Sequence, residues 1–241
     1  MVVGLGPGGV ELLSPQARLA IAACPVVAGY KTYLDLIPEL LVGKEIICTG
    51  MTREVERCAQ ALARAAAGER VAIVSSGDPG VYGMAGLILE MAARDGLLEK
   101  VDIQVVPGIT AATAAAARLG APLMHDFAVI SLSDLLTPWE LIERRLEAAA
   151  AADFVLVLYN PASHRRREQI NVARQIMLRH KEPTTPVGLV RNAYREEESC
   201  VITDLQNMLE HPVDMLTIVF IGNSSTRVLG KYMVTPRGYQ V

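Results

Sequence analysis

The sequence has 241 residues, enough for one large domain or two modest ones, and its 51% apolar content predicts a well-filled globular core rather than a disordered chain. The formal net charge of −3 argues against a nucleic-acid-binding protein, because such proteins carry a strongly positive balance. Aromatic residues make up only 5%, so the core is mainly aliphatic, which is typical of α/β proteins with buried parallel strands.

Aliphatic strands alternate with helical segments in the first half of the chain. The predicted strands are 2–5, 24–30, 45–50, 70–76 and 101–106, and the predicted helices are 15–23, 32–36, 52–67, 84–95 and 110–119. Apolar residues recur at helical spacing, as in Val55, Cys58, Ala59 and Leu62. This alternation predicts βαβ units and a largely parallel sheet.

The pattern starts again near Leu119–Pro122. The second half contains predicted strands at 127–133, 153–159, 186–190, 199–203 and 215–221, with helices at 138–151, 164–180 and 204–210. Because several of these strands follow one another directly, we expect a mixed sheet. The fold class is therefore α/β, with two α/β domains (1–119 and 120–241) and a ligand cleft between them.

The four cysteines and four histidines show no metal-ligand spacing, so no metal site is expected. Reduced thiols are typical of a cytoplasmic protein. A strand-like segment instead of a signal peptide begins the chain, and no apolar stretch approaches the ~20 residues of a membrane span. We therefore expect a cytoplasmic protein that binds neither membranes nor nucleic acids.

GLGPGG at residues 4–9 has the G-x-G-x-x-G spacing of a dinucleotide-binding turn. An NAD site also needs an acidic residue about 20 positions later, to bind the ribose hydroxyls. None occurs between Glu11 and Asp35, and Pro7 lies within the turn. A tight strand-to-helix connection is the alternative, and the missing acid favours it over the NAD hypothesis.

SSGDPGVYGMAG at residues 75–86 places Asp78 between Gly77 and Pro79, with no basic residue before Arg94. A carboxylate repels phosphate but suits ribose hydroxyls or a cationic group such as a sulfonium. The alternative is an Asx-type turn, which Asp-Pro-Gly forms readily.

A third glycine turn, Pro107-Gly108, precedes an alanine-rich helix that begins near Thr110. Its small residues permit close approach of either a neighbouring helix or a flat ligand. All three turns follow strands, so we expect them to lie together at the carboxyl edge of the sheet, where α/β proteins bind ligands.

These motifs resemble the tetrapyrrole (corrin and porphyrin) methyltransferases from one end of the chain to the other. The signatures that carry the resemblance are GLGPGG, SSGDPGVYG, PGITAATAAAARLGAPLMHDF and LYNPAS. The segments AGYKTY, TGMTREVERC, SLSDLLTPW, TPVGLVRNA and MVTPRGY resemble the branch of that family that methylates C17 in cobalamin (vitamin B12) biosynthesis.

The resemblance implies two α/β domains, a homodimer, and S-adenosyl-L-methionine (SAM) as methyl donor in the cleft. The polycarboxylate tetrapyrrole substrate would lie in a trough of the first domain. Some relatives carry an additional iron–sulfur domain, but no bound cluster is expected here. The implied cofactor-binding residues are Pro7 at the cleft floor; Gly77, Asp78, Pro79, Val81 and Tyr82 beside the methionine part and ribose; Thr110 and Ala111 at its carboxylate or amino end; and Asn160, Ala193, Thr217 and Ile218 around adenine.

No residue can be assigned as the acid or base for the accompanying ring contraction, so the catalytic residues are unknown. Lys31 and Arg53 are weak candidates, which could instead bind substrate carboxylates or be solvated. His125 and Asp126 suggest a buried polar pair at a hinge, or else a catalytic pair. The charged run 164–168 is interpreted either as an anion clamp or as a solvated face.

The leading hypothesis is a SAM-dependent methyltransferase that methylates C17 of precorrin-3B or cobalt-factor III, with ring contraction to precorrin-4 or cobalt-precorrin-4. Methylation at another ring position, or of a different substrate, is the alternative within the family. An NAD-linked oxidoreductase and a non-catalytic binding module are the alternatives from other classes.

Overall fold

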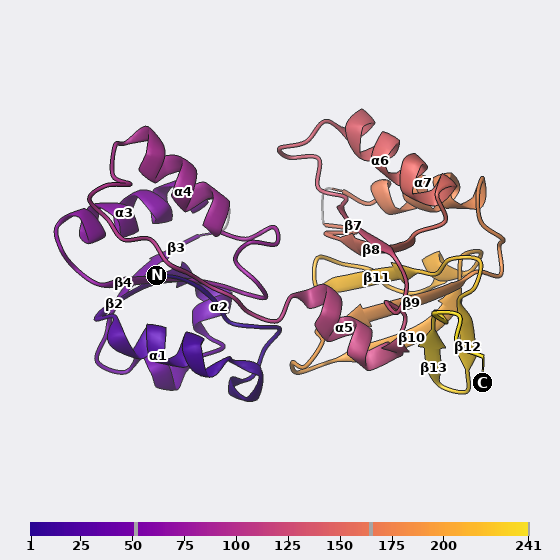
Figure 1. Cartoon of the computed structure of the whole chain (residues 1–241), viewed down its shortest axis with the longest axis horizontal. Coiled ribbons are helices and arrows are strands. Elements are labelled where there is room, and N and C mark those ends of the chain that lie inside the picture. The colour runs from indigo at the N-terminus through magenta and orange to yellow at the C-terminus, as the bar shows by residue number, and fades with distance from the viewer. Residues whose placement is uncertain (51–52, 164–165, 241) are drawn as a thin grey trace. The chain divides into compact units, whose positions relative to one another are not determined.

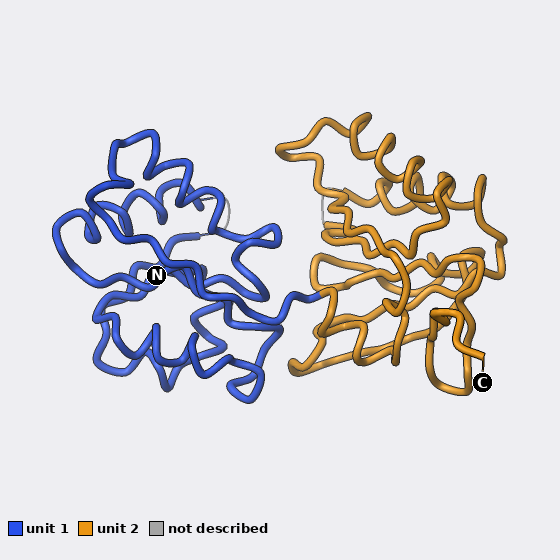
Figure 2. The backbone as a smooth tube through the Cα atoms, in the orientation of Figure 1, with its two compact units in different colours: residues 1–111 blue, residues 112–241 orange. Residues whose placement is uncertain are grey.

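A computed structural model describes residues 1–50, 53–163 and 166–240. The chain divides into two compact units, Met1–Ala111 and Ala112–Val241 (Figure 2). The sequence predicts a boundary after residue 119. In the structure the division falls after Ala111, so nearly all of helix α5 (Ala111–Leu119) belongs to the second unit.

The first unit contains one five-stranded sheet in which every strand pair is parallel, in the order β3-β2-β4-β1-β5. Its strands are β1 (Val2–Gly4), β2 (Val26–Tyr30), β3 (Glu45–Thr49), β4 (Val71–Ser75) and β5 (Val105–Val106). Its helices are α1 (Pro15–Ala23), α2 (Lys31–Leu34), α3 (Glu54–Ala66) and α4 (Ala85–Arg94). The predicted parallel sheet is confirmed.

Helices cover both faces of this sheet, α1 and α2 on one and α3 and α4 on the other (Figure 1). The strands alternate accordingly: Val27 packs with α1, whereas Val26 and Ala28 pack with α3 and α4. Burial on both faces explains why the inner strands β1, β2 and β4 are almost continuously apolar and show no alternation of apolar and polar residues.

The second unit has a mixed five-stranded sheet, in the order β10-β9-β11-β8-β7, in which only β7 and β8 pair in parallel. Its strands are β7 (Phe127–Ser131), β8 (Val155–Tyr159), β9 (Pro186–Arg191), β10 (Ser199–Asp204) and β11 (Thr217–Ile221). A second sheet consists of β6 (Gly120–Ala121), β12 (Arg227–Leu229) and β13 (Tyr232–Val234). The predicted mixed sheet is confirmed.

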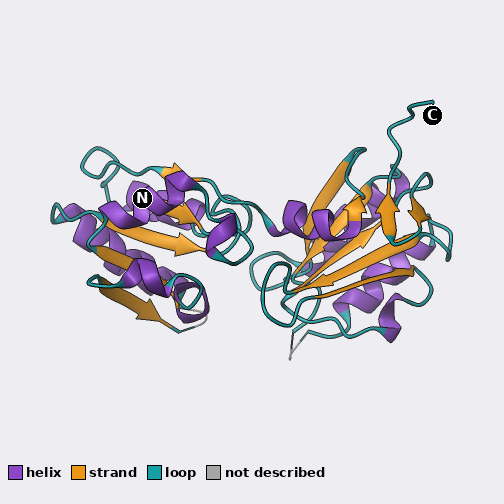
Figure 3. Ribbon diagram, turned by 90° about the horizontal axis from the view of Figure 1, so that it is seen from below, coloured by secondary structure: helices purple, strands orange, loops and turns teal. Residues whose placement is uncertain are grey.

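Helices α6 (Trp139–Ala151) and α7 (Gln169–Leu178) pack on one face of the mixed sheet, and α5 lies on the other (Figures 1 and 3). A Cβ atom on Gly188 of β9 would lie 2.4 Å from Cδ1 of Leu119. Glycine at this position therefore lets α5 lie close against the sheet.

Several element predictions were wrong or incomplete. Residues 204–210 form no helix beyond the single 3-10 turn Met208–Glu210, because Asp204 ends β10 and its carboxylate accepts a hydrogen bond from the Asn207 amide. Strand 101–106 is reduced to Val105–Val106. Helix α7 begins only at Gln169, whereas positions 52, 164 and 165 of the predicted helices lie outside the described residues. The strands β6, β12 and β13 were not predicted.

The three glycine turns meet at the carboxyl edge of the first sheet, as predicted. Gly6 and Gly77 exchange two backbone hydrogen bonds, N–H to O, of 3.1 and 2.7 Å. A Cβ atom on Gly108 would lie 2.2 Å from the Gly77 carbonyl oxygen, and one on Gly4 would lie 2.6 Å from the Gly108 nitrogen. The backbones touch directly, so this edge depends on glycine at each turn.

We expect Gly108→Ala to lower the free energy of unfolding by roughly 1–3 kcal/mol, because the new methyl group must displace backbone instead of a flexible side chain. Urea denaturation of the purified chain measures this. The control is Gly86→Ala in helix α4, where a Cβ meets no atom within 4 Å and the change should stabilise by roughly 0.5–1 kcal/mol. Equal stabilities of the two variants would contradict the close packing of the turns.

Candidate functional site

The GLGPGG turn differs from a dinucleotide-binding turn in the element that comes after it. Gly9 leads into a single 3-10 turn, Val10–Leu12, and helix α1 begins only at Pro15. The motif therefore does not place a helix N-terminus over its own glycines, as a bound pyrophosphate requires. Pro7 is buried beside the Gly6–Gly77 bridge.

Asp78 joins two of the three turns. Its Oδ1 accepts a hydrogen bond from the Gly80 amide at 2.8 Å, and its Oδ2 accepts one from the Gly108 amide at 3.1 Å. The first is the Asx turn that the sequence left open, and the second ties the loop after β4 to the loop after β5. A carboxylate has about four acceptor positions, so this half-buried group retains capacity for a hydroxyl or a cation.

The remaining first-unit candidates surround this point. Pro79 is buried, whereas Val81 and Tyr82 are exposed, and Tyr82 has a left-handed φ of 53° that is uncommon for an aromatic residue. Thr110 and Ala111 are partly buried at the start of α5. Residues 4–9, 75–84 and 105–112 contain no lysine or arginine. The three loops thus suit a cationic or neutral ligand better than a phosphate.

The four candidates of the second unit lie at one edge of its mixed sheet. Asn160 directly follows β8, and Ala193 lies two positions beyond the end of β9. Thr217 and Ile218 begin β11, where they pair with Arg191 and Val190 of β9. Because β11 runs antiparallel to both β8 and β9, its first residues lie beside the ends of those strands. The structure therefore brings these residues together within their unit.

Arg166 organises this edge and was not singled out from the sequence. Its side chain is buried, and Nη1 donates to the carbonyl oxygens of Leu132 at 2.9 Å and Asn160 at 3.1 Å. Its Nε lies 3.7 Å from the Asp134 carboxylate. One guanidinium thus connects the loops after β7 and β8. The only sequence signal was the charged run 164–168, two residues of which, 164 and 165, lie outside the described residues.

Asp214 holds Thr217 in place. The Thr217 hydroxyl donates to Oδ1 of Asp214 at 2.9 Å, and Arg191 donates to Oδ2 at 2.8 Å. Partial burial raises the pKa of the Asp214 carboxyl, but hydrogen bonds from Arg191, the Leu216 amide and Thr217 outweigh it, so the net pKa lies below its ordinary value.

Lys31 and Arg53 both pair with acids a few positions further along the chain. Lys31 Nζ lies 2.7 Å from Asp35, and Arg53 Nε lies 2.6 Å from Glu56; all four side chains are largely exposed. The hydrogen bond that Lys31 donates to Asp35 raises the pKa of the lysine. A lysine held protonated in this way is a poor general base at neutral pH, so for Lys31 the carboxylate-binding and solvated alternatives remain.

The expectation of a buried His125–Asp126 pair was wrong. Both side chains are exposed, and the pair is 3.9 Å apart.

The described residues hold no cluster of three or more His, Cys, Asp or Glu side chains that could bind a metal ion. Burial raises the pKa of the Cys58 thiol to about 11, so this group is not a nucleophile at neutral pH. Within the described residues, no helix combines the length and apolar character needed to cross a membrane.

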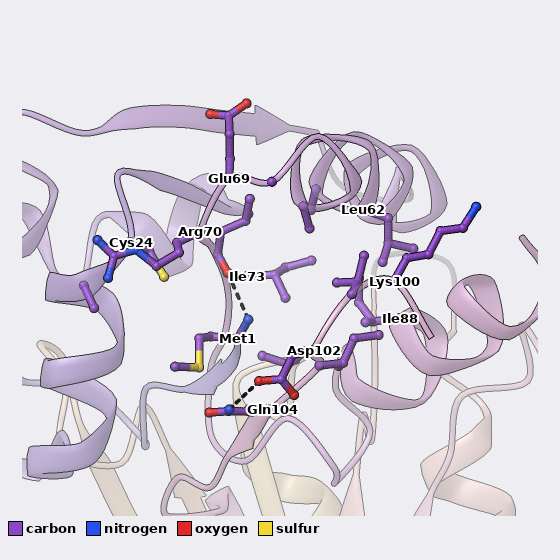
Figure 4. A pocket seen from close by; sticks show the side chains of 18 residues that line it. Met1, Cys24, Leu62, Glu69, Arg70, Ile73, Ile88, Lys100, Asp102 and Gln104 are labelled. Atoms are coloured by element: carbon purple, nitrogen blue, oxygen red, sulfur yellow. Dashed lines mark hydrogen bonds between the residues drawn. The ribbon is translucent and has the colours of Figure 1, made fainter. Parts of the chain in front are cut away.

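A cavity of about 330 Å³ lies at the opposite, amino edge of the first sheet (Figure 4). It is lined by residues that include Met1, Cys24, Arg70, Lys100 and Asp102, and by none of the candidate site residues. Its charges have both signs and its remaining lining is mostly aliphatic, so its chemistry selects no ligand class.

The fold and the glycine-turn edge define the class of protein. A family model described as Tetrapyrrole (Corrin/Porphyrin) Methylases matches residues 1–209. The chain therefore belongs to the tetrapyrrole methylase family, and the resemblance predicted from its motifs is confirmed.

Individual relatives are similar along the whole chain. It is 53% identical to "Cobalt-factor III methyltransferase" of Priestia megaterium, covering 100% of this chain but only 45% of that protein. It is 48% identical to "Probable cobalt-factor III C(17)-methyltransferase" of Salmonella typhimurium, covering 99% of this chain and 98% of the relative. The chain thus spans about half of the first relative and nearly all of the second.

Solved structures agree. The methyltransferase CobJ superposes with a TM-score of 0.90 at 38% identity, covering 98% of both chains. Uroporphyrin-III C-methyl transferase of Thermus thermophilus, complexed with S-adenyl homocysteine, has a TM-score of 0.68 at 27% identity and covers 92% of this chain and 90% of that chain. These matches confirm the predicted α/β fold class.

We expect Arg166→Met to destabilise the second unit, because two carbonyl oxygens lose a charged donor at roughly 1–3 kcal/mol each. Urea denaturation measures this loss. The neighbouring exposed Arg167→Met is the matched control and should change stability by less than about 0.5 kcal/mol. If both variants unfolded like the wild-type chain, the hydrogen bonds of Arg166 would not be what stabilises this edge of the sheet.

Asp214 should make the folding stability of the chain fall at acid pH. Its native pKa lies below the unfolded value of 3.8, so its contribution is present above that pH and is lost as the pH falls toward the native pKa. Calorimetry between about pH 6 and pH 3 should show a steeper fall of Tm for the wild-type chain than for Asp214→Asn. The same slope in the wild-type chain and in Asp214→Asn would contradict the assignment.

Proposed function

We propose that this chain is a SAM-dependent methyltransferase of cobalamin biosynthesis that methylates C17 of cobalt-factor III, with ring contraction to cobalt-precorrin-4. Its similarity to proteins named for cobalt-factor III, including one matched over 98% of its length, supports this activity and substrate. Precorrin-3B, the metal-free counterpart, is the alternative substrate.

The observation that carries the proposal is the meeting of three cation-free glycine turns around the Asp78 carboxylate. SAM bears a sulfonium cation and ribose hydroxyls, and both fit a carboxylate with acceptor capacity remaining. A dinucleotide pyrophosphate would meet that carboxylate with no basic side chain in the three loops, so this edge disfavours an NAD-linked oxidoreductase. The relative crystallised with S-adenyl homocysteine supports the same cofactor class.

The proposed cofactor-binding residues fall into two groups. In the first unit, Asp78 and the backbone around it bind the ribose and the methionine part, with Pro7, Gly77, Pro79, Val81, Tyr82, Thr110 and Ala111. In the second unit, Asn160, Ala193, Thr217 and Ile218 bind adenine, a neutral planar group for which small and apolar side chains are suitable neighbours. Arg166 and Asp214 hold these second-unit residues in place through the contacts described above.

Bound SAM supplies a methyl group made electrophilic by the sulfonium. The residues of this chain hold the two reactants in alignment, with the methyl acceptor opposite the leaving sulfur. Such alignment lowers the barrier by roughly 7–11 kcal/mol. The glycine turns hold their positions through the backbone hydrogen bonds between Gly6 and Gly77 and the bond from the Gly108 amide to Asp78. Lys31 and Arg53 are assigned to substrate carboxylates and not to proton transfer. A homodimer is part of the proposal through family resemblance alone.

The test is incubation of the purified chain with cobalt-factor III and isotopically labelled SAM, followed by mass spectrometry. We expect one labelled methyl group on the macrocycle and consumption of one SAM per product. Product analysis by NMR should place the methyl group at C17. Precorrin-3B, assayed in parallel, should react more slowly.

Calorimetric titration with S-adenosyl-homocysteine and with NAD separates the classes independently of substrate. We expect binding of the first and none of the second. Tight NAD binding without a response to S-adenosyl-homocysteine would overturn the proposal. Methyl transfer to a different intermediate would leave a tetrapyrrole methyltransferase but overturn the C17 assignment.

A further inference from the structure

Arg57 is a buried cation that the methyl-transfer proposal does not use. It lies in the first turn of helix α3 and its side chain is only 3% exposed. Nη1 donates to the Thr49 hydroxyl at 2.7 Å, at the carboxyl end of β3. Among the described residues, Nη2 has the Met84 thioether sulfur as its hydrogen-bond partner, at 4.0 Å, and Nε–H has no acceptor.

No carboxylate of the described residues forms an ion pair with this guanidinium. The arginines at positions 53 and 64, at the start and near the end of the same helix, both have acidic partners. Removing a guanidinium from water without a counter-charge is unfavourable, so Arg57 holds a buried charge that no carboxylate of the described residues neutralises.

The unsatisfied side of the guanidinium has a definite shape. Nε–H and Nη2–H point in parallel and form the fork that binds a carboxylate with two hydrogen bonds. A thioether is a weak acceptor on a flexible side chain, so Met84 can cover this fork and be displaced from it. Met84 ends the loop that begins with Asp78, and Thr49 ends β3, so the fork lies among the loops at the carboxyl edge of the sheet.

We propose that the Nε–Nη2 fork of Arg57 binds a peripheral carboxylate of the tetrapyrrole substrate, displacing the Met84 thioether. The inference rests on the proposed function for its ligand class, a polycarboxylate macrocycle. Arg57 is then a specificity residue: the substrate carboxylate supplies the counter-charge that the protein lacks. Uncarboxylated macrocycles leave the cation unpaired and are rejected.

The test compares Arg57→Met with the wild-type chain in two measurements. Thermal unfolding of the ligand-free protein should show an equal or higher Tm for the variant, because an apolar side chain replaces an unpaired buried charge. Absorbance titration with cobalt-factor III should show a Kd weakened by about tenfold or more, since a charged pair is lost. The Kd for S-adenosyl-homocysteine should stay unchanged.

Arg57→Gln is the second variant, because it keeps a polar side chain while lacking the charge and the fork. It should fold and show the same weakened macrocycle binding. Arg64→Met, on the same helix but paired with Glu45 and Glu69, is the matched control; it should lower the Tm slightly and leave the Kd for cobalt-factor III unchanged.

Two results would overturn the inference. The first is macrocycle binding by Arg57→Gln that equals that of the wild-type chain. The second is a lowered Tm in both Arg57 variants together with an equal loss of affinity for S-adenosyl-homocysteine and for the macrocycle. The second result would show a purely structural role. A wild-type chain that binds cobalt-factor III but transfers no methyl group would overturn the proposed function and leave the role of Arg57 intact.

Discussion

The direct backbone contact among Gly4, Gly77 and Gly108 is the constraint on which the first unit's functional edge depends. The neighbouring strands β4, β1 and β5 end side by side here, and side chains would normally keep their loops apart. Without Cβ atoms the loops approach until carbonyl and amide groups touch, as in the Gly6–Gly77 bridge. That approach puts the Asp78 carboxylate within hydrogen-bond distance of the Gly108 amide, thirty residues away in sequence. The position of the site's main acidic group thus follows from the absence of side chains.

The second unit stabilises its edge by a different interaction. Its sheet is mixed, so β10 and β11 begin at the edge where β7, β8 and β9 end. A buried guanidinium, that of Arg166, instead connects two loops through their carbonyl oxygens, and Asp214 anchors the first residue of β11. Close backbone packing and charged hydrogen bonds are two solutions to one problem, which is to hold irregular backbone rigidly enough to bind a small molecule.

Two charged side chains at the carboxyl edge of the first sheet, Asp78 and Arg57, have different kinds of partner. The Asp78 anion is compensated by two backbone amides, whereas the Arg57 cation faces a thioether. An anion with acceptor capacity remaining and a cation without a counter-charge suit two ligands of opposite character, a sulfonium and a polycarboxylate. This division is physically coherent with methyl transfer to a carboxylated macrocycle, because neither ligand competes for the charge that serves the other.

Most of the fold could be predicted from the sequence, because aliphatic strands and helical periodicity are local signals. The parallel sheet of residues 2–106 and the mixed sheet after residue 127 both follow from them, as do the three turns and the family. Short or edge elements escaped: β6, β12 and β13 have two or three residues each, too few for any period to appear. The predicted helix at 204–210 does not form, because Asp204 makes a local hydrogen bond that ends the strand in a turn.

By itself, then, the sequence determined the class of elements, their order and the chemical character of the glycine loops. Only the tertiary structure decided the partners of the buried arginines: exposed Arg53 pairs with nearby Glu56, whereas buried Arg57 and Arg166 contact Met84 and Leu132, 27 and 34 positions away, through the packing of the strands and loops.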